Sequence, residues 1–163
     1  MDSMIALEMQ KNLQNEKAAI GKPLPTFSFK TPNGVVSNAS LKGQVVFINF
    51  WFASCAPCLR EFAGLNQLYQ KLYTRKDFVF ISFTYEKPEV VNKIRAEYSI
   101  PYAVISISQA ECRKLMQDFG YPISYVVSRK GVVQHLIHGG EPTQEEATKA
   151  IMSQVYPAIL KQL

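Results

Sequence analysis

Short apolar runs alternate with longer segments of helical periodicity along most of the chain. Residues 45–50 and 78–84 are almost continuously apolar. Such runs predict strands buried on both faces, because a half-exposed strand would alternate with polar residues. Residues 103–107 form a third, shorter run. Apolar residues at helical spacing follow these runs, over residues 55–72, 88–98 and 109–119. Helical crossovers between buried strands imply that the strands are parallel neighbours.

Two hairpins flank this core. In the first, residues 27–30 and 35–37 are joined through Asn33-Gly34, a pair that favours the positive backbone angles of a tight turn. In the second, residues 124–127 pair with residues 132–137. The pattern therefore predicts an α/β fold in which helices flank a mixed central sheet.

The two ends of the chain are predicted to be helical. A last helix begins after Thr143, a favoured N-cap residue, and is expected to bend at Pro157. Residues 1–20 are interpreted as an amphipathic helix or a tether. The segment Gly21–Pro25 is a stiff, extended lead-in, because each proline restricts the residue before it.

Composition narrows the class of protein. The chain has 163 residues, 47% of them hydrophobic, which suits one globular domain. Its net charge of +5 comes from scattered basic residues, so no nucleic-acid partner is expected. No run of 18 apolar residues occurs, and residues 1–20 lack the apolar core of a signal peptide. Either the protein is cytoplasmic or a leader or anchor preceded the sequence shown.

The strongest chemical signal is Cys55-Ala56-Pro57-Cys58 at the predicted start of a helix. Unsatisfied backbone N–H groups and the positive end of the helix dipole favour a thiolate there. In such settings the pKa of a cysteine commonly falls from about 8.5 into the range of roughly 3.5 to 7.5. We expect Cys55 to be an exposed nucleophile and Cys58 a more buried resolving thiol. No cofactor is expected, because the two sulfurs suffice.

A metal site is the main alternative for the same cysteines. His135 and His138 could complete a four-ligand zinc site with Cys55 and Cys58. However, the two histidines lie three apart on a predicted strand, and alternation turns them to opposite faces. Both are therefore interpreted as ordinary strand or loop residues, and no metal is expected.

Residues 46–61, which read VFINFWFASCAPCLRE, resemble the active-site segment of the TlpA/ResA-like thioredoxins. The likeness extends from Gly21 to the final helix. It implies a thioredoxin fold with an N-terminal β-hairpin extension over residues 21–163, preceded by the helix or tether of residues 1–20. It also implies an extracytoplasmic, often membrane-anchored oxidoreductase, and so favours the periplasm or cell envelope over the cytoplasm.

The resemblance also assigns roles outside the two cysteines. Pro122, after Gly120-Tyr121, matches the cis-proline loop that presents its backbone to the partner. Glu86 matches a carboxylate that in some relatives exchanges a proton with the resolving thiol. Trp51 matches an aromatic residue beside the site. The predicted partner-binding set is Trp51, Ala56, Pro57, Tyr121 and Pro122, and the predicted catalytic set is Cys55, Cys58 and Glu86.

Several positions depart from the family pattern. Asn49 stands where cytoplasmic thioredoxins carry a buried aspartate, and Ser54 and Ala63 replace residues common in relatives. The bulky Tyr121 replaces a smaller residue and leaves partner preference open. The third cysteine, Cys112, has no counterpart and is expected to be a buried, inert thiol.

The predicted function is thiol–disulfide oxidoreduction, directed toward reduction of protein disulfides in the cell envelope. Its partners would be a client protein and an upstream electron donor, with a monomeric chain and a membrane tether upstream of the sequence shown. Two alternatives remain open. A peroxiredoxin-type peroxidase lacks support because Phe52 occupies the threonine position of the Thr-x-x-Cys pattern. A copper carrier would use the cysteines as soft ligands.

Overall fold

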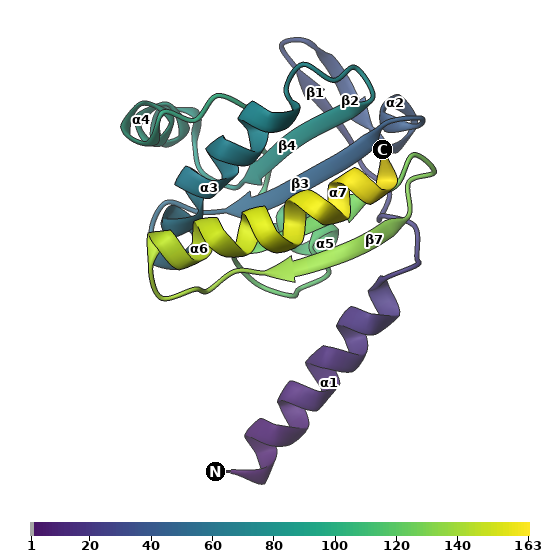
Figure 1. Cartoon of the computed structure of the whole chain (residues 1–163), viewed down its shortest axis with the longest axis vertical. Coiled ribbons are helices and arrows are strands. Elements are labelled where there is room, and N and C mark those ends of the chain that lie inside the picture. The colour runs from purple at the N-terminus through teal and green to yellow at the C-terminus, as the bar shows by residue number, and fades with distance from the viewer. Residues whose placement is uncertain (1) are drawn as a thin grey trace.

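The computed structural model describes residues 2–163 (Figure 1). Its centre is a five-stranded mixed sheet with the strand order β5-β4-β3-β6-β7. β3 is parallel to β4, which is parallel to β5, whereas β6 is antiparallel to both β3 and β7. The strands are β3 (Val45–Trp51), β4 (Phe78–Thr84), β5 (Ala103–Ser106), β6 (Ile123–Val127) and β7 (Val133–His138). The predicted α/β class and mixed sheet are confirmed.

Helices cover both faces of this sheet. α3 (Ala56–Leu72), α4 (Pro88–Tyr98) and α7 (Tyr156–Gln162) contribute to one apolar cluster, and α5 (Gln109–Leu115) contributes to the other. α6 (Gln144–Ala150) contacts α3. In Figure 1, α6 and α7 cross in front of the sheet and α5 lies behind it. Every residue of β3 is buried, as the apolar run predicts, because the strand is covered on both sides.

Alternation along β3 sends successive side chains to opposite layers. Phe47 and Trp51 lie in the cluster beneath α3, whereas Ile48 and Phe50 lie in the cluster beneath α5. Asn49 has the parity of Phe47 and Trp51, so its polar side chain is turned toward α3. Asn49 therefore lies on the side of the sheet that also carries Cys55 and Cys58.

The N-terminal hairpin forms its own small sheet. β1 (Ser28–Thr31) pairs with β2 (Gly34–Ser37) across a two-residue turn, and the predicted hairpin extension is confirmed. A short helix, α2 (Asn38–Leu41), follows it and was not predicted. The rings of Phe27 and Phe29 meet Phe83 edge-on at 6.0 and 5.8 Å, which anchors the hairpin on the α5 side of the sheet.

Helix α1 (Ser3–Ala19) extends away from the body, as Figure 1 shows in purple. Its apolar residues Met4 and Leu7 are 73% and 64% exposed. The carboxylate of Glu16 contacts His138 Nε2, and a groove of about 900 Å³ separates the helix from residues 117–119. Residues 3–19 are thus helical, and their role as a tether stays a prediction. Within residues 2–163, no helix is both long and apolar enough to cross a membrane.

Helix α5 is shorter than predicted. It ends at Leu115 rather than Phe119, because Gln117 and Asp118 take left-handed backbone angles, φ 54° and 58°. The Asp118 N–H donates to the Arg113 carbonyl at 3.0 Å and closes the helix end. Apolar spacing alone did not reveal this turn.

The C-terminal helix is irregular just before Pro157, and the predicted bend at Pro157 stays a prediction. A π-helical turn, η1 (Ile151–Val155), joins α6 to α7, and the Tyr156 N–H donates to the Ile151 carbonyl five residues back. Pro157 has no N–H to donate and sits in the first turn of α7, where one is not needed.

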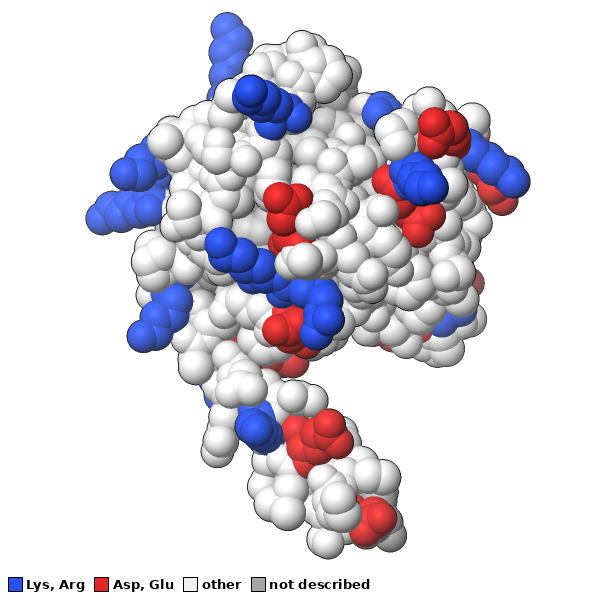
Figure 2. Space-filling model, turned by 180° about the vertical axis from the view of Figure 1, so that it is seen from behind, with Lys and Arg blue, Asp and Glu red and all other residues white. Residues whose placement is uncertain are grey.

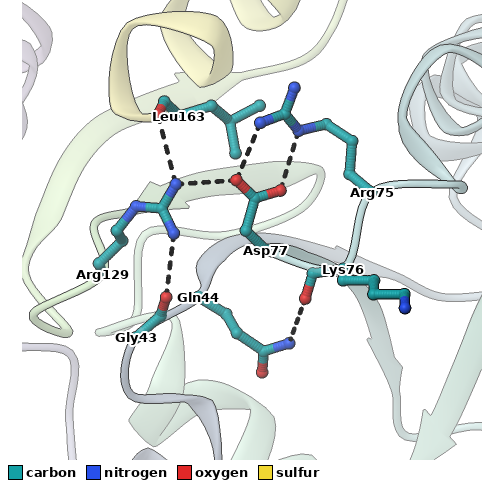
Figure 3. Close-up of polar contacts among 7 residues, drawn as sticks. All are labelled: Gly43, Gln44, Arg75, Lys76, Asp77, Arg129 and Leu163. Carbon is teal, nitrogen blue, oxygen red and sulfur yellow. Dashed lines mark hydrogen bonds and ion pairs between the residues drawn. The ribbon is translucent and has the colours of Figure 1, made fainter.

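A cluster of charged side chains, Arg75, Asp77 and Arg129, lies at the end of the sheet at which β3 and β4 begin (Figure 3). Asp77 accepts two hydrogen bonds from Arg75, at 2.9 and 2.8 Å, and one from Arg129 at 2.8 Å. Arg129 also donates to the carbonyls of Gly43 and Leu163. These contacts connect the lead-in to β3, the β6–β7 turn and the C-terminus.

The charged side chains on the face in Figure 2 form no large patch of one sign. Lys and Arg side chains lie scattered there, with acidic side chains among them.

Candidate active site

The two cysteines of the Cys55–Cys58 segment are joined by a disulfide, with their Cα atoms 5.2 Å apart. Cys55 is the N-cap of α3, and its Sγ accepts a hydrogen bond from the Cys58 backbone N–H at 3.3 Å. Pro57 lies in the first turn, where its missing N–H removes no helical bond. The helix start therefore offers an N–H donor to Cys55 Sγ, which is the arrangement predicted to favour its thiolate.

The exposure of the pair differs from expectation. Cys55 is 5% exposed and Cys58 is 1% exposed in the disulfide form. The predicted order is right, but Cys55 is nearly buried rather than exposed, because it belongs to the apolar cluster beneath α3. Ala56 is exposed and Pro57 half-buried, so both predicted contact residues lie at the surface.

The loop before β6 contains the predicted cis-proline, Pro122. The peptide bond between Tyr121 and Pro122 is cis. Pro122 is buried and its carbonyl accepts a hydrogen bond from the Gly139 N–H at 3.2 Å, whereas Tyr121 is half-buried and packs against the cluster that contains both cysteines.

Trp51 lies in the core and not on the partner-facing surface. Its side chain is 0% exposed, and its ring meets Phe62 of α3 edge-on at 5.4 Å. As the last residue of a strand covered on both faces, it has no route to solvent. Its contribution in this structure is to pack α3 against β3.

Glu86 is half-buried just beyond β4. Its backbone N–H donates to Thr84 Oγ1 at 3.3 Å. Within residues 2–163 its carboxylate makes no hydrogen bond or ion pair. Its assigned proton-exchange role therefore stays a prediction.

A second carboxylate, Glu61, is buried beneath the site. The residue is 7% exposed, and burial raises the pKa of its carboxyl group from 4.5 to about 7. The nearby polar side chain of Asn49 on β3 opposes this rise, and the charge of Glu141 adds to it. Because Glu61 follows Cys58 by three residues on α3, the two side chains lie on the same helix face.

Sequence reasoning passed over Glu61, although a signal was present. Cys58, Glu61, Phe62 and Leu65 occupy the i, i+3, i+4 and i+7 positions of the stripe that faces the core. A charged residue on such a stripe is costly unless something holds it there, and it is a candidate for a functional group.

The β7–α6 loop closes over this carboxylate. A Cβ at Gly139 would overlap Glu61 Oε1 and approach Pro122 Cγ to 2.5 Å, so no side chain fits at this position. Arg60 Nε donates to the Glu141 carbonyl at 2.9 Å and ties the loop to α3. The loop thus seals the space between the cis-proline loop and Glu61.

Comparison with known proteins identifies the group to which these features belong. Residues 19–152 match the family described as Redoxin. The chain belongs to the Redoxin family. It is 31% identical to the thioredoxin-like protein YneN of Bacillus subtilis over 129 residues, which cover 77% of this chain and 75% of that protein. It is also 31% identical to the thiol-disulfide oxidoreductase ResA of Bacillus anthracis, over 80% of this chain and 76% of the relative.

A solved structure supports the same assignment for this redoxin. The crystal structure of a candidate DsbE thiol:disulfide interchange protein from Chlorobium tepidum superposes with a TM-score of 0.71 and 26% identity. The match covers 86% of this chain and 97% of that chain. The fold, the disulfide between Cys55 and Cys58 and the relatives all indicate the same activity. The redoxin is a thiol–disulfide oxidoreductase of the thioredoxin fold. The same findings do not favour the copper-carrier and peroxidase alternatives.

The redoxin's remaining candidate groups lie apart from the cysteine pair. His138 contacts Glu16, and His135 is half-buried on β7. In the described part of the chain, no three or more His, Cys, Asp or Glu side chains are grouped to hold a metal ion. Cys112 is buried as predicted, and burial raises the pKa of its thiol to about 11, so the thiol stays protonated at neutral pH.

Proposed function

We propose that this redoxin reduces disulfides of partner proteins, with Cys55 as the attacking sulfur and Cys58 as the resolving sulfur. The observation that carries the proposal is the position of Cys55 at the N-cap of α3, where its Sγ accepts the Cys58 N–H. Cys55 is also the more exposed of the two residues. Cys58 is therefore poorly placed for a first attack on a bulky disulfide.

The reaction has two steps. The Cys55 thiolate attacks one sulfur of the partner disulfide, the partner's S–S bond breaks, and the second partner sulfur leaves as a thiolate that takes up a proton. Cys58 then loses its proton and attacks Cys55 Sγ, which releases the first partner sulfur as a thiol and forms the Cys55–Cys58 disulfide. Two electrons pass from the dithiol to the partner, and a separate dithiol donor must return them.

Glu61 is our candidate for the group that takes the Cys58 proton. It lies on the same face of α3, one helical turn from Cys58, and its pKa near 7 allows it both to accept and to release a proton at neutral pH. Glu86 is the other candidate, as the resemblance predicts. The burial of Glu61 and its contact with Asn49 favour Glu61.

We also propose that the protein acts outside the cytoplasm, as the resemblance to TlpA/ResA-like proteins implies, with a client protein and an electron donor as partners. The similarity to ResA supports this placement. Fractionation of the source cells checks it, and recovery of the protein solely with the cytoplasm would contradict it.

The attacking sulfur is identified by trapping. Reduced Cys58→Ala, mixed with a short peptide disulfide, should hold one peptide on Cys55 and release one equivalent of peptide thiol, as peptide mapping by mass spectrometry would show. Cys55→Ala should trap at least tenfold more slowly, because Cys58 is 1% exposed. Cys112→Ala is the matched control and should reduce the peptide like the unaltered protein. Faster trapping on Cys58 than on Cys55 would reverse the assigned roles.

The direction of the reaction is tested by the reduction potential. We expect a value nearer that of thioredoxin, about −270 mV, than that of DsbA, about −120 mV. Equilibration with glutathione buffers measures it. A value above about −150 mV would make the protein an oxidant and overturn the reductase assignment.

A further inference from the structure

Strand register places three aromatic residues in one row beside the disulfide. The last registered pairs are Trp51 with Thr84 and Phe50 with Ile123. One step beyond the first pair brings Phe52 beside Tyr85. Continuing the antiparallel register of the second pair for two residues brings Phe52 opposite Tyr121. β3 is the middle strand of the three, so Phe52 lies between the other two rings.

The three rings touch one another. Phe52 and Tyr85 stack with centroids 5.7 Å apart, and Tyr121 meets Phe52 edge-on at 5.0 Å. Tyr85 and Tyr121 also meet edge-on, at 5.9 Å. We call Phe52, Tyr85 and Tyr121 the aromatic row. Rings that support one another in this way are held in fixed positions.

The aromatic row is partly exposed, unlike the row beneath it. Phe50, Phe83 and Ile123 share its face of the sheet and are 0%, 0% and 1% exposed. Phe52, Tyr85 and Tyr121 are each only half-buried. The three rings therefore lie at the margin of the apolar core, partly covered by it and partly open to solvent.

This surface is continuous with the dithiol. The Cys55 N–H donates to the Phe52 carbonyl at 3.2 Å, so Phe52 begins the turn that carries the attacking sulfur. Tyr121 immediately precedes Pro122 in the loop before β6. A partner disulfide that reaches Cys55 Sγ therefore approaches the turn that Phe52 begins.

We propose that the aromatic row binds a bulky apolar side chain that flanks the disulfide of the partner, so that the enzyme prefers disulfides with phenylalanine, leucine or similar residues beside the cysteine. The inference rests on the proposed function, because the partner reaches the row only by reacting with Cys55. The exposed part of the three rings gains most from contact with an apolar side chain, whereas serine or glycine next to the cysteine would leave it in contact with water.

Two peptide disulfides of equal length and charge test the preference, one with phenylalanine and one with serine on each side of the cysteine. The prereduced enzyme is mixed with each, and the released peptide thiol is measured after an acid quench. We expect the second-order rate constant to be about tenfold higher for the phenylalanine peptide. Phe52→Ala and Tyr85→Leu should each lower this ratio to about threefold or less. Tyr73→Ala, which removes an exposed aromatic residue just beyond the far end of α3, should keep the original ratio.

The outcomes are separable. Equal rates for the two peptides with the unaltered enzyme, or a ratio that survives in both Phe52→Ala and Tyr85→Leu, would overturn the aromatic row as a recognition surface while leaving the reductase assignment intact. Failure to reduce either peptide would instead count against the proposed function. Because each variant is judged by a ratio of its own two rates, a partial loss of folded protein does not alter the result.

Discussion

Ionising the Glu61 carboxyl group costs free energy in the folded protein, because folding raises its pKa from 4.5 to about 7. Between pH 4.5 and about 7 the folded protein keeps this proton, whereas the unfolded chain has lost it. Stability should therefore fall as pH rises from about 4.5 to about 7 and stay reduced above that range. A shift of this size corresponds to roughly 3 kcal/mol.

Glu61→Gln should remove this cost. In the disulfide form we expect the variant to gain stability over the unaltered protein by up to about 3 kcal/mol at pH 8, and little at pH 4, because glutamine does not ionise. Urea unfolding at both pH values measures the difference. Glu86→Gln is the matched control, because it makes the same substitution at a glutamate that is half-buried rather than buried in the core. The same pair compares the proposed proton acceptors, since slower release of a trapped peptide in Glu61→Gln alone would support Glu61.

At the residue scale, the sequence predicted the reacting atoms better than their surroundings. Cys55 and Cys58 follow from their spacing and their place at a helix start. The role of Glu61 could not be predicted in this way. Its neighbour Asn49 lies on β3, and the loop that covers it comes from residues 139–141. Contacts of this kind depend on how strands pair, which a single sequence does not state.

At the scale of elements, the β7–α6 loop does not tolerate a side chain at Gly139. Gly139→Ala should force Glu61 or Pro122 aside and destabilise the protein by roughly 1–3 kcal/mol, a typical cost of overpacking. Urea unfolding measures the loss. If the overlap with Glu61 is the cause, the same substitution should cost less in a Glu61→Ala background. Equal costs in both backgrounds would place the clash at Pro122 instead.

The elements themselves were largely predictable. Continuous apolar runs marked β3 and β4, and Asn33-Gly34 marked the hairpin. Errors arose where local geometry overrides apolar spacing, as at Gln117 and Asp118, whose left-handed angles end α5 early. The packing of the β7–α6 loop on α3 through Arg60 had no local signal.

At the scale of the whole molecule, the pair formed by Asp77 and Arg129 joins separate parts of the chain, because Arg129 also contacts Gly43 and Leu163. Hydrogen bonds from Arg75 and Arg129 hold the pKa of the Asp77 carboxyl group well below the usual range. A depressed pKa in the folded state means that this contribution to stability is present above the unfolded pKa of about 4 and is lost as pH falls below it.

Asp77→Asn should therefore lower the melting temperature at pH 7, by roughly 2–4 °C, and the difference from the unaltered protein should shrink as pH is lowered toward 2. Thermal unfolding followed by circular dichroism across this pH range provides the measurement. Asp118→Asn, which breaks the more exposed pair with Arg113, is the control and should have a smaller effect at pH 7. A loss independent of pH would show that Asp77 acts through shape rather than charge.

The aromatic row has a consequence for protein engineering. Its members come from three separate stretches of sequence, the residues just after β3, just after β4 and just before β6, and their rings meet because these three strands are neighbours in the sheet. Three point substitutions at the equivalent rows of another protein of this fold should transplant the surface, and removing them here should give a scaffold with little discrimination. Selectivity in such a scaffold could then be adjusted one ring at a time, while the sulfur chemistry stays as it is.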